Sequence, residues 1–102
     1  MVGVGKLMKQ AAKMQQQLQT LQDEMAQTVI EVSGGGGAVN IKITLQQEIK
    51  AIQLDPEFLK EDRQLIEETL TEAVREAVNR SKAQSEEKMS AITSGFSLPG
   101  MF

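Results

Sequence analysis

The sequence contains no cysteine, no histidine, no tryptophan and no tyrosine. Without cysteine there are no disulfides and no thiolate nucleophiles, and without histidine as well the usual ligands of zinc are missing. The lack of histidine also removes the commonest general base. These absences disfavour most familiar classes of enzyme, so we expect a non-enzymatic protein with no metal and no cofactor.

Long apolar runs are also lacking. No stretch approaches the roughly 18 apolar residues of a membrane span, and the opening MVGVGKLMKQ has no long apolar segment of the kind found in secretory signals. We therefore expect a cytoplasmic protein without a membrane partner. A chain of 102 residues has the size of one domain, which we place at residues 1–94. Glycine and proline interrupt residues 95–102, which we expect to form a flexible tail.

A narrow apolar seam runs through LMKQAAKMQQQLQTLQDEM, where apolar residues recur at alternating spacings of four and three among glutamines and lysines. This period predicts a helix from about Lys6 to Gln27. Packing within the same chain is one use for such a seam. Because the rest of the helix is so polar, we expect contact with a second copy. The helix-one seam comprises Leu7, Ala11, Met14, Leu18, Leu21 and Met25.

The middle of the chain changes to a period of two, which predicts strands around Ile30–Val32 and Val39–Leu45. The glycines between them predict a hairpin turn, since no Lys-Ser/Thr follows them as a phosphate loop requires. The third run, Glu48–Leu54, changes parity near Ala51. Either a β-bulge shifts the pattern there or both faces of this strand are partly covered.

The helical period returns after Asp55-Pro56, from about Asp62 to Thr93. The expected fold is therefore α+β: an N-terminal helix, a three-stranded antiparallel sheet and a long C-terminal helix, with the helices on one face of the sheet. The apolar stripe of the second helix comprises Ile66, Leu70, Ala73, Val74, Ala77 and Val78.

Charge is distributed unevenly around a formal net charge of −3. Residues 1–22 carry three lysines and no acid, whereas residues 23–72 carry eleven acids and four bases. Because one helix leads into the sheet and the other leads out, both basic ends should project from it. Two such ends in a dimer would grip a phosphate backbone better than one. The expected DNA-binding residues are Lys6, Lys9, Lys13, Arg80, Lys82 and Lys88.

Several stretches, in this order, resemble the YbaB/EbfC family of small bacterial nucleoid-associated proteins: LMKQAAKMQQQLQTLQDEM, SGGGGAVNIKI, IQLDPEFL and EEKMSAITSGFSLPGMF. The resemblance covers almost the whole chain. It implies a tweezer-like homodimer that binds double-stranded DNA near the tips of protruding helices, at the nucleoid of a bacterium or plastid. Lys9 and Lys88 match the family pattern, Lys6 stands where the family varies, and the basic pair of some members is missing around Ala51.

Two other interpretations stay open. The lysines of the first helix are also compatible with an ordinary solvated face, and Arg75 and Arg80 follow Glu72 and Glu76 at spacings that favour pairing within the helix. The rival function is a dimeric adaptor that binds a protein partner through the acidic middle or the C-terminal tail. Direct reading of bases has little support, because no recognition helix is evident and Phe96, in the tail, is the one aromatic residue near the basic ends.

Overall fold

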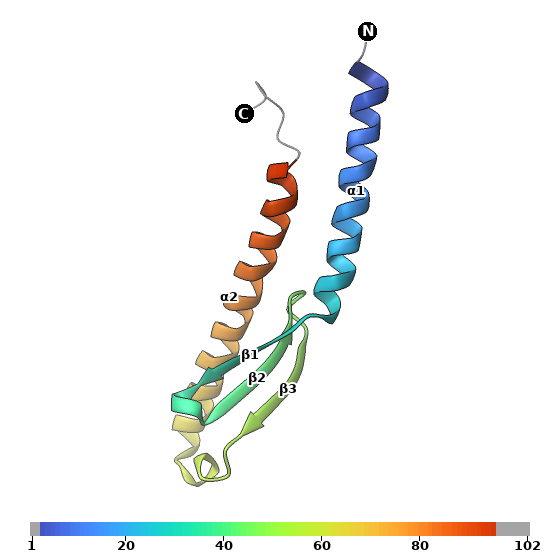
Figure 1. The fold of residues 1–102 in the computed structure, drawn as a ribbon. Helices are drawn as coiled ribbons and strands as arrows, with labels where there is room; N and C mark the ends of the chain where they lie inside the picture. The colour runs from blue at the N-terminus through green and yellow to red at the C-terminus, as the bar shows by residue number, and fades with distance from the viewer. Residues whose placement is uncertain (1–2, 96–102) are drawn as a thin grey trace.

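A three-stranded antiparallel sheet joins two long helices in the computed structural model, which describes residues 3–95 (Figure 1). The order is α1 (Gly3–Gln27), β1 (Val29–Gly34), β2 (Val39–Thr44), β3 (Ile49–Leu54) and α2 (Arg63–Gly95), with short 3-10 turns at Gly35–Gly37 and Phe58–Lys60. The predicted α+β fold and element order are confirmed. The predicted flexible tail, residues 95–102, lies outside the described residues from residue 96 onward.

Neighbouring strands pair in the order β1-β2-β3, each antiparallel to the next. The register between β2 and β3 shifts once, because Lys42 pairs with Ala51 whereas Ile43 pairs with Ile49. Lys50 is therefore an extra residue in β3. Of the two explanations for the parity change, the structure contains the β-bulge.

The main core lies between the sheet and the first half of α2. Ala73 and Ala77 are almost fully buried there, and their small side chains let the helix approach the sheet closely. Gly34 is part of the same fit, since a Cβ at this position would lie 2.8 Å from the Cβ of Ala73. The other buried members are Val32, Val39, Ile41, Ile43 and Phe58, and the predicted stripe residues Ile66, Leu70, Val74 and Val78 pack against them.

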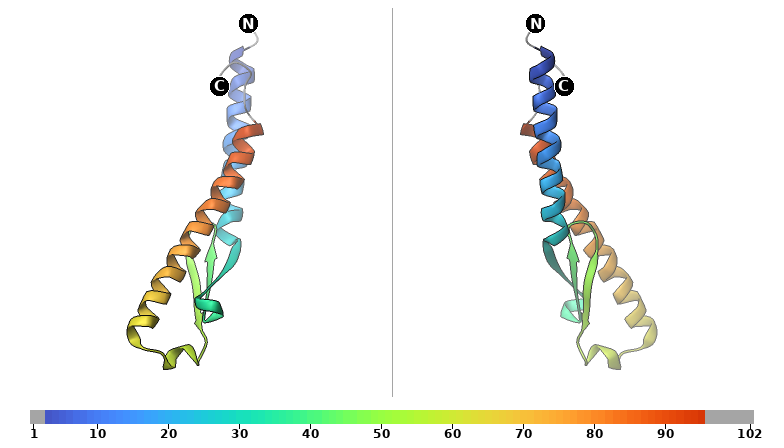
Figure 2. Two further views of the ribbon diagram at one scale, coloured as in Figure 1. Left: turned by 90° about the vertical axis from the view of Figure 1, so that its left-hand side faces the viewer. Right: turned by 90° about the vertical axis from the view of Figure 1, so that its right-hand side faces the viewer.

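A second, smaller cluster joins the end of α1 to the rest of the chain. Leu21, Met25 and Leu45 are buried together, and Ile92 of α2 packs against them. Nearby, the buried Ser81 hydroxyl donates a hydrogen bond of 2.6 Å to the carbonyl oxygen of Thr44. This contact fixes α2 to the end of β2, so both helices leave the sheet from the same end (Figures 1 and 2).

Candidate nucleic-acid interface

The two helices protrude from the sheet side by side and in opposite chain directions (Figures 1 and 2). Their relative register is given by Ser85, whose hydroxyl donates to the sulfur of Met25 at 3.4 Å. Counting ten residues along each helix from this pair places Gln15 level with Gly95, the last described residue of α2. Residues 3–14, which we call the distal arm, therefore extend about 18 Å further.

The distal arm carries Lys6, Lys9 and Lys13, and all three side chains are exposed. None of them forms an ion pair with any residue between 3 and 95. The first acidic residue of α1 is Asp23, well below the arm. The arm is thus a helical segment with positive charge alone, and its three ammonium groups are available to an anionic partner.

The three basic residues expected on α2 are exposed but do not join this cluster. Ser81 is fixed at the end of β2, so its neighbours Arg80 and Lys82 lie level with the edge of the sheet. Lys88 lies about 10 Å further along the helix. Arg80 is also engaged within α2, because its Nε donates to Oε1 of Glu76 at 2.7 Å. The structure thus separates the six expected residues into a lysine cluster on the arm and a dispersed group on α2.

Burial divides the helix-one seam into two parts. Leu21 and Met25 are buried within the chain, and Met14 and Leu18 are half-buried. Ala11 is exposed, and Leu7 retains 50% of its accessible surface. The lower half of the seam therefore packs inside the chain, while the upper half lies uncovered on the distal arm.

A groove between α1 and α2 adds polar groups that the sequence analysis did not select. Gln16, Gln17 and Thr20 line it on the α1 side, and Ile92 lines it on the α2 side. Amide and hydroxyl groups of this kind commonly donate to phosphate oxygens. Their position beside the seam was visible in the sequence, but only the register of the two helices shows that they face a groove below the arm.

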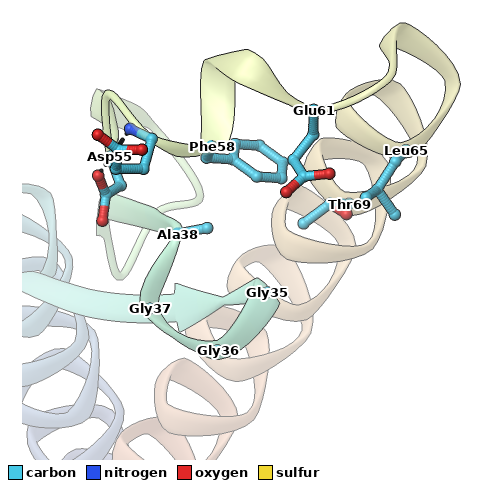
Figure 3. Close-up of a pocket in the computed structure, with 10 residues that line it drawn as sticks. Gly35, Gly36, Gly37, Ala38, Asp55, Phe58, Glu61, Leu65 and Thr69 are labelled. Atoms are coloured by element: carbon cyan, nitrogen blue, oxygen red, sulfur yellow. Dashed lines mark hydrogen bonds between the residues drawn. The ribbon is translucent and has the colours of Figure 1, made fainter.

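The opposite end of the molecule has a different chemistry. A pocket there lies between the Gly35–Gly37 turn and the start of α2, with Phe58 and Leu65 in its walls (Figure 3). Its charged lining residues are all acidic: Asp55, Glu57 and Glu61. The glycines join β1 to β2 and lead into no helix, as expected for a turn. This pocket is therefore poorly suited to phosphate.

The described residues contain neither a metal-holding cluster of side chains nor a membrane-spanning helix. Between residues 3 and 95, no group of three or more acidic side chains is arranged to hold a metal ion. In the same range, neither helix combines the length and apolar character needed to cross a bilayer.

Comparisons with known proteins give the family of this chain and a solved structure with a similar fold. The family described as the YbaB/EbfC DNA-binding family matches residues 1–96. A nucleoid-associated protein of Dictyoglomus turgidum is 37% identical over 97 residues, which cover 93% of each chain. The crystal structure of an uncharacterized protein from Helicobacter pylori superimposes with a TM-score of 0.78 and 16% identity, over 91% of this chain and 99% of that one. At that identity, the latter similarity concerns the fold.

Proposed function

Because this chain belongs to the YbaB/EbfC DNA-binding family, we propose that it is a nucleoid-associated protein that binds double-stranded DNA mainly through phosphate contacts and with low sequence specificity. The observation that carries this proposal is the distal arm, with three exposed lysines and no acid. The name of the Dictyoglomus turgidum relative supports the nucleoid as the site of action.

The chemistry of the arm favours the DNA backbone over the bases. Lysine carries a point charge on a flexible side chain, so its ammonium group can contact phosphates in many positions. It does not present the fixed set of donors that would recognise one particular base. Lys6 and Lys13 are seven residues apart, about 10 Å along the helix, which matches roughly three phosphates of one strand. The arm has no aromatic residue to stack on a base. Binding should therefore depend weakly on sequence.

The acidic residues of the chain are compatible with DNA binding because they lie outside the distal arm. Residues 23–76 carry twelve acids and five bases, and most of them lie on the sheet, the pocket of Figure 3 and the first half of α2. A DNA duplex would repel that end and attract the arm. The charge separation therefore orients the protein as it approaches, even though its net charge is −3.

We also propose that the functional unit is a homodimer. One arm offers three lysines, and a second arm held at a fixed distance would make the next set of contacts effectively intramolecular. Leu7 and Ala11, the exposed part of the helix-one seam, are one surface available to a second copy. Affinity would then come from two arms that each bind DNA weakly rather than from one arm that binds it strongly.

The test is fluorescence anisotropy with two unrelated duplexes over a range of salt concentrations. The arm variant replaces Lys6, Lys9 and Lys13 with alanine. The matched control replaces Lys42, Lys60 and Arg63 with alanine, which removes the same charge from the acidic end, where each of them pairs with a glutamate. We expect the arm variant to bind both duplexes more weakly, with a log–log salt slope flatter by roughly 2.7 for each arm engaged. The control should keep the slope.

Equal losses in the two variants would mean that net charge, and not the arm, determines binding. No binding of the wild type even at low salt would favour the rival function, an adaptor for a protein partner. The exposed Leu59 and Leu65 beside the acidic pocket are the feature that supports such a partner. Heparin chromatography separates the two functions, since an adaptor contacted through its acidic end should not be retained.

A further inference from the structure

The helix-one seam continues past the end of α2, where no residue between 3 and 95 lies opposite it. Its members share one side of α1, because they recur at spacings of three and four. Lower on the helix, Met25 accepts a hydrogen bond from Ser85 and Leu21 is buried beside Ile92, so this side is directed toward α2. Above the level of Gln15 the same side has no helix to pack against (Figures 1 and 2).

The uncovered part of the seam is longer than the heptad pattern alone indicates. Val4 lies three residues before Leu7, so it continues the same row toward the N-terminus. Val4 is 64% exposed and Leu7 is 50% exposed. Exposed apolar side chains that gather in one row indicate a contact surface, whereas scattered ones do not. We call Val4, Leu7, Ala11 and Met14 the upper seam.

The seven residues that follow Gly95 have the composition of a segment that would bury itself. Their sequence is FSLPGMF, which contains no charged residue and two of the three phenylalanines of the chain. Segments that stay solvated are usually rich in charge and poor in aromatic residues. The expectation of a flexible tail rested on glycine and proline, which exclude a helix but allow an extended contact. The large apolar members are Phe96, Leu98, Met101 and Phe102.

The point at which this segment leaves α2 fits the upper seam. Gly95 lies level with Gln15, at the base of the distal arm. Seven residues in extended conformation span about 23 Å, and the arm extends about 18 Å. The segment is therefore long enough to follow the whole upper seam without any change in either helix. Its covalent link to α2 also makes the contact intramolecular, which favours it over binding of a separate molecule.

We propose that residues 96–102 lie along the upper seam of their own chain and cover its apolar side chains. Phe96 and Leu98 are separated by one residue, so in an extended segment they point to the same side. Ser97, between them, then points away from the arm. The contact continues the packing of α1 against α2 beyond the last turn of α2.

This contact leaves the lysines of the arm free. Lys9 and Lys13 each lie two residues from Ala11, which is about 160° around the helix. A segment on the upper seam therefore does not cover them. DNA and the segment would use opposite sides of the arm, so the inference does not depend on the proposed function. The homodimer would then form through another surface than Leu7 and Ala11.

The lack of native cysteine makes disulfide trapping a direct test. One variant carries Leu98→Cys and Ala11→Cys, which places one thiol in the segment and one on the upper seam. The control carries Leu98→Cys and Ala12→Cys, because Ala12 is also exposed but lies about 100° around the helix. In a glutathione buffer we expect the 11–98 disulfide to form at least about tenfold more favourably than the 12–98 disulfide, since docking holds only the first pair within bonding distance.

Non-reducing electrophoresis and peptide mass spectrometry separate the outcomes. Equal yields of the two disulfides would overturn the proposal, because a segment without a docking site meets both positions alike. A disulfide that joins two chains would overturn it as well, and would assign the upper seam to the same segment of a second copy.

Hydrogen exchange tests the contact without new cysteines. The contact is local, so it acts on the fraying of the arm and not on the unfolding of the whole chain. Phe96→Ser combined with Leu98→Ser should raise the exchange rates of amides 7–14 at least about threefold. The matched control is Leu59→Ser combined with Leu65→Ser, which removes two exposed apolar side chains from the opposite end and should leave the arm unchanged.

Unchanged exchange in β2 checks that both variants are folded. If the arm of the folded F96S/L98S variant exchanged at the wild-type rate, the proposal would be wrong. DNA takes no part in these measurements, so a failure here leaves the proposed function standing, and failure of the lysine variants leaves this contact standing.

Discussion

Gly35 and Gly36 both have a positive φ, of +60° and +69°, but different surroundings. A Cβ at Gly35 would lie 2.6 Å from Cγ2 of Thr69 in α2, whereas a Cβ at Gly36 would meet nothing within 4 Å. The turn therefore has one position that is restricted by backbone conformation alone and one that is also restricted by close packing against the helix.

We predict that Gly36→Ala costs about 1 kcal/mol of unfolding free energy, which is the strain of a left-handed backbone. Gly35→Ala should cost at least about 2 kcal/mol, because the clash with Thr69 is added. Urea unfolding followed by circular dichroism measures both values. Equal costs would show that the turn moves away from α2 without loss.

At the same scale, the sequence was sufficient to predict that the lysines are exposed. The helical period also places Ser81 on the apolar side of α2, but the sequence does not predict the partners of its hydroxyl. Charged residues on a polar helix face are exposed in almost any fold, so Lys6, Lys9 and Lys13 could be predicted as exposed. Ser81 is completely buried. Its hydroxyl is satisfied there because it donates to the carbonyl oxygen of Thr44 and accepts from Nε2 of Gln47 at 2.9 Å. Those partners are more than thirty residues away, and no local pattern indicates them.

Among the elements, α1 illustrates what periodicity leaves open. A spacing of four and three predicts a helix with one apolar side, but the pattern is the same whether that side packs on its own chain or on another. The two halves of the helix-one seam differ in burial, since Leu21 is 8% exposed and Leu7 is 50% exposed. Only the position of the sheet and α2, which close over the lower half of α1, makes the difference.

This division predicts different costs for the same substitution. Leu21→Ala should lower the unfolding free energy by about 2–4 kcal/mol, because it leaves a cavity beside Met25 and Leu45. Leu7→Ala should change it by less than about 0.5 kcal/mol, as for other exposed positions. Urea unfolding at low protein concentration provides the comparison. A large loss in L7A alone would place the essential packing of α1 on its upper half.

For the whole molecule, the direction in which both helices leave the sheet followed from element order, and with it the separation of charge. The further extension of α1 past Gly95 did not, because it depends on the register set by Met25 and Ser85. That register decides that the six expected basic residues do not form one cluster. Element order was therefore enough to predict which end of the molecule is basic. It was not enough to predict which of the six basic residues lie together there.

The two-arm arrangement predicts a specific change in DNA binding when the dimer is lost. A monomeric variant should bind a duplex long enough for both arms more weakly than the wild type, with about half the log–log salt slope, because half as many phosphates are neutralised. On a duplex long enough for one arm only, the two proteins should bind alike. Anisotropy with both duplex lengths measures this. An unchanged slope on the longer duplex would mean that each arm acts alone.

The length of the arm beyond α2 has a consequence for helix–coil equilibrium. A free helix of about twelve residues is marginal in water, so the arm depends on propagation from the buried turns around Leu21 and Met25. Its first turn contains no acid to offset the positive end of the helix dipole, and Lys6 and Lys9 follow closely. A phosphate group near that end supplies the missing negative charge. DNA would thus stabilise the very helix that binds it, and the coil-to-helix equilibrium of the arm becomes part of the affinity.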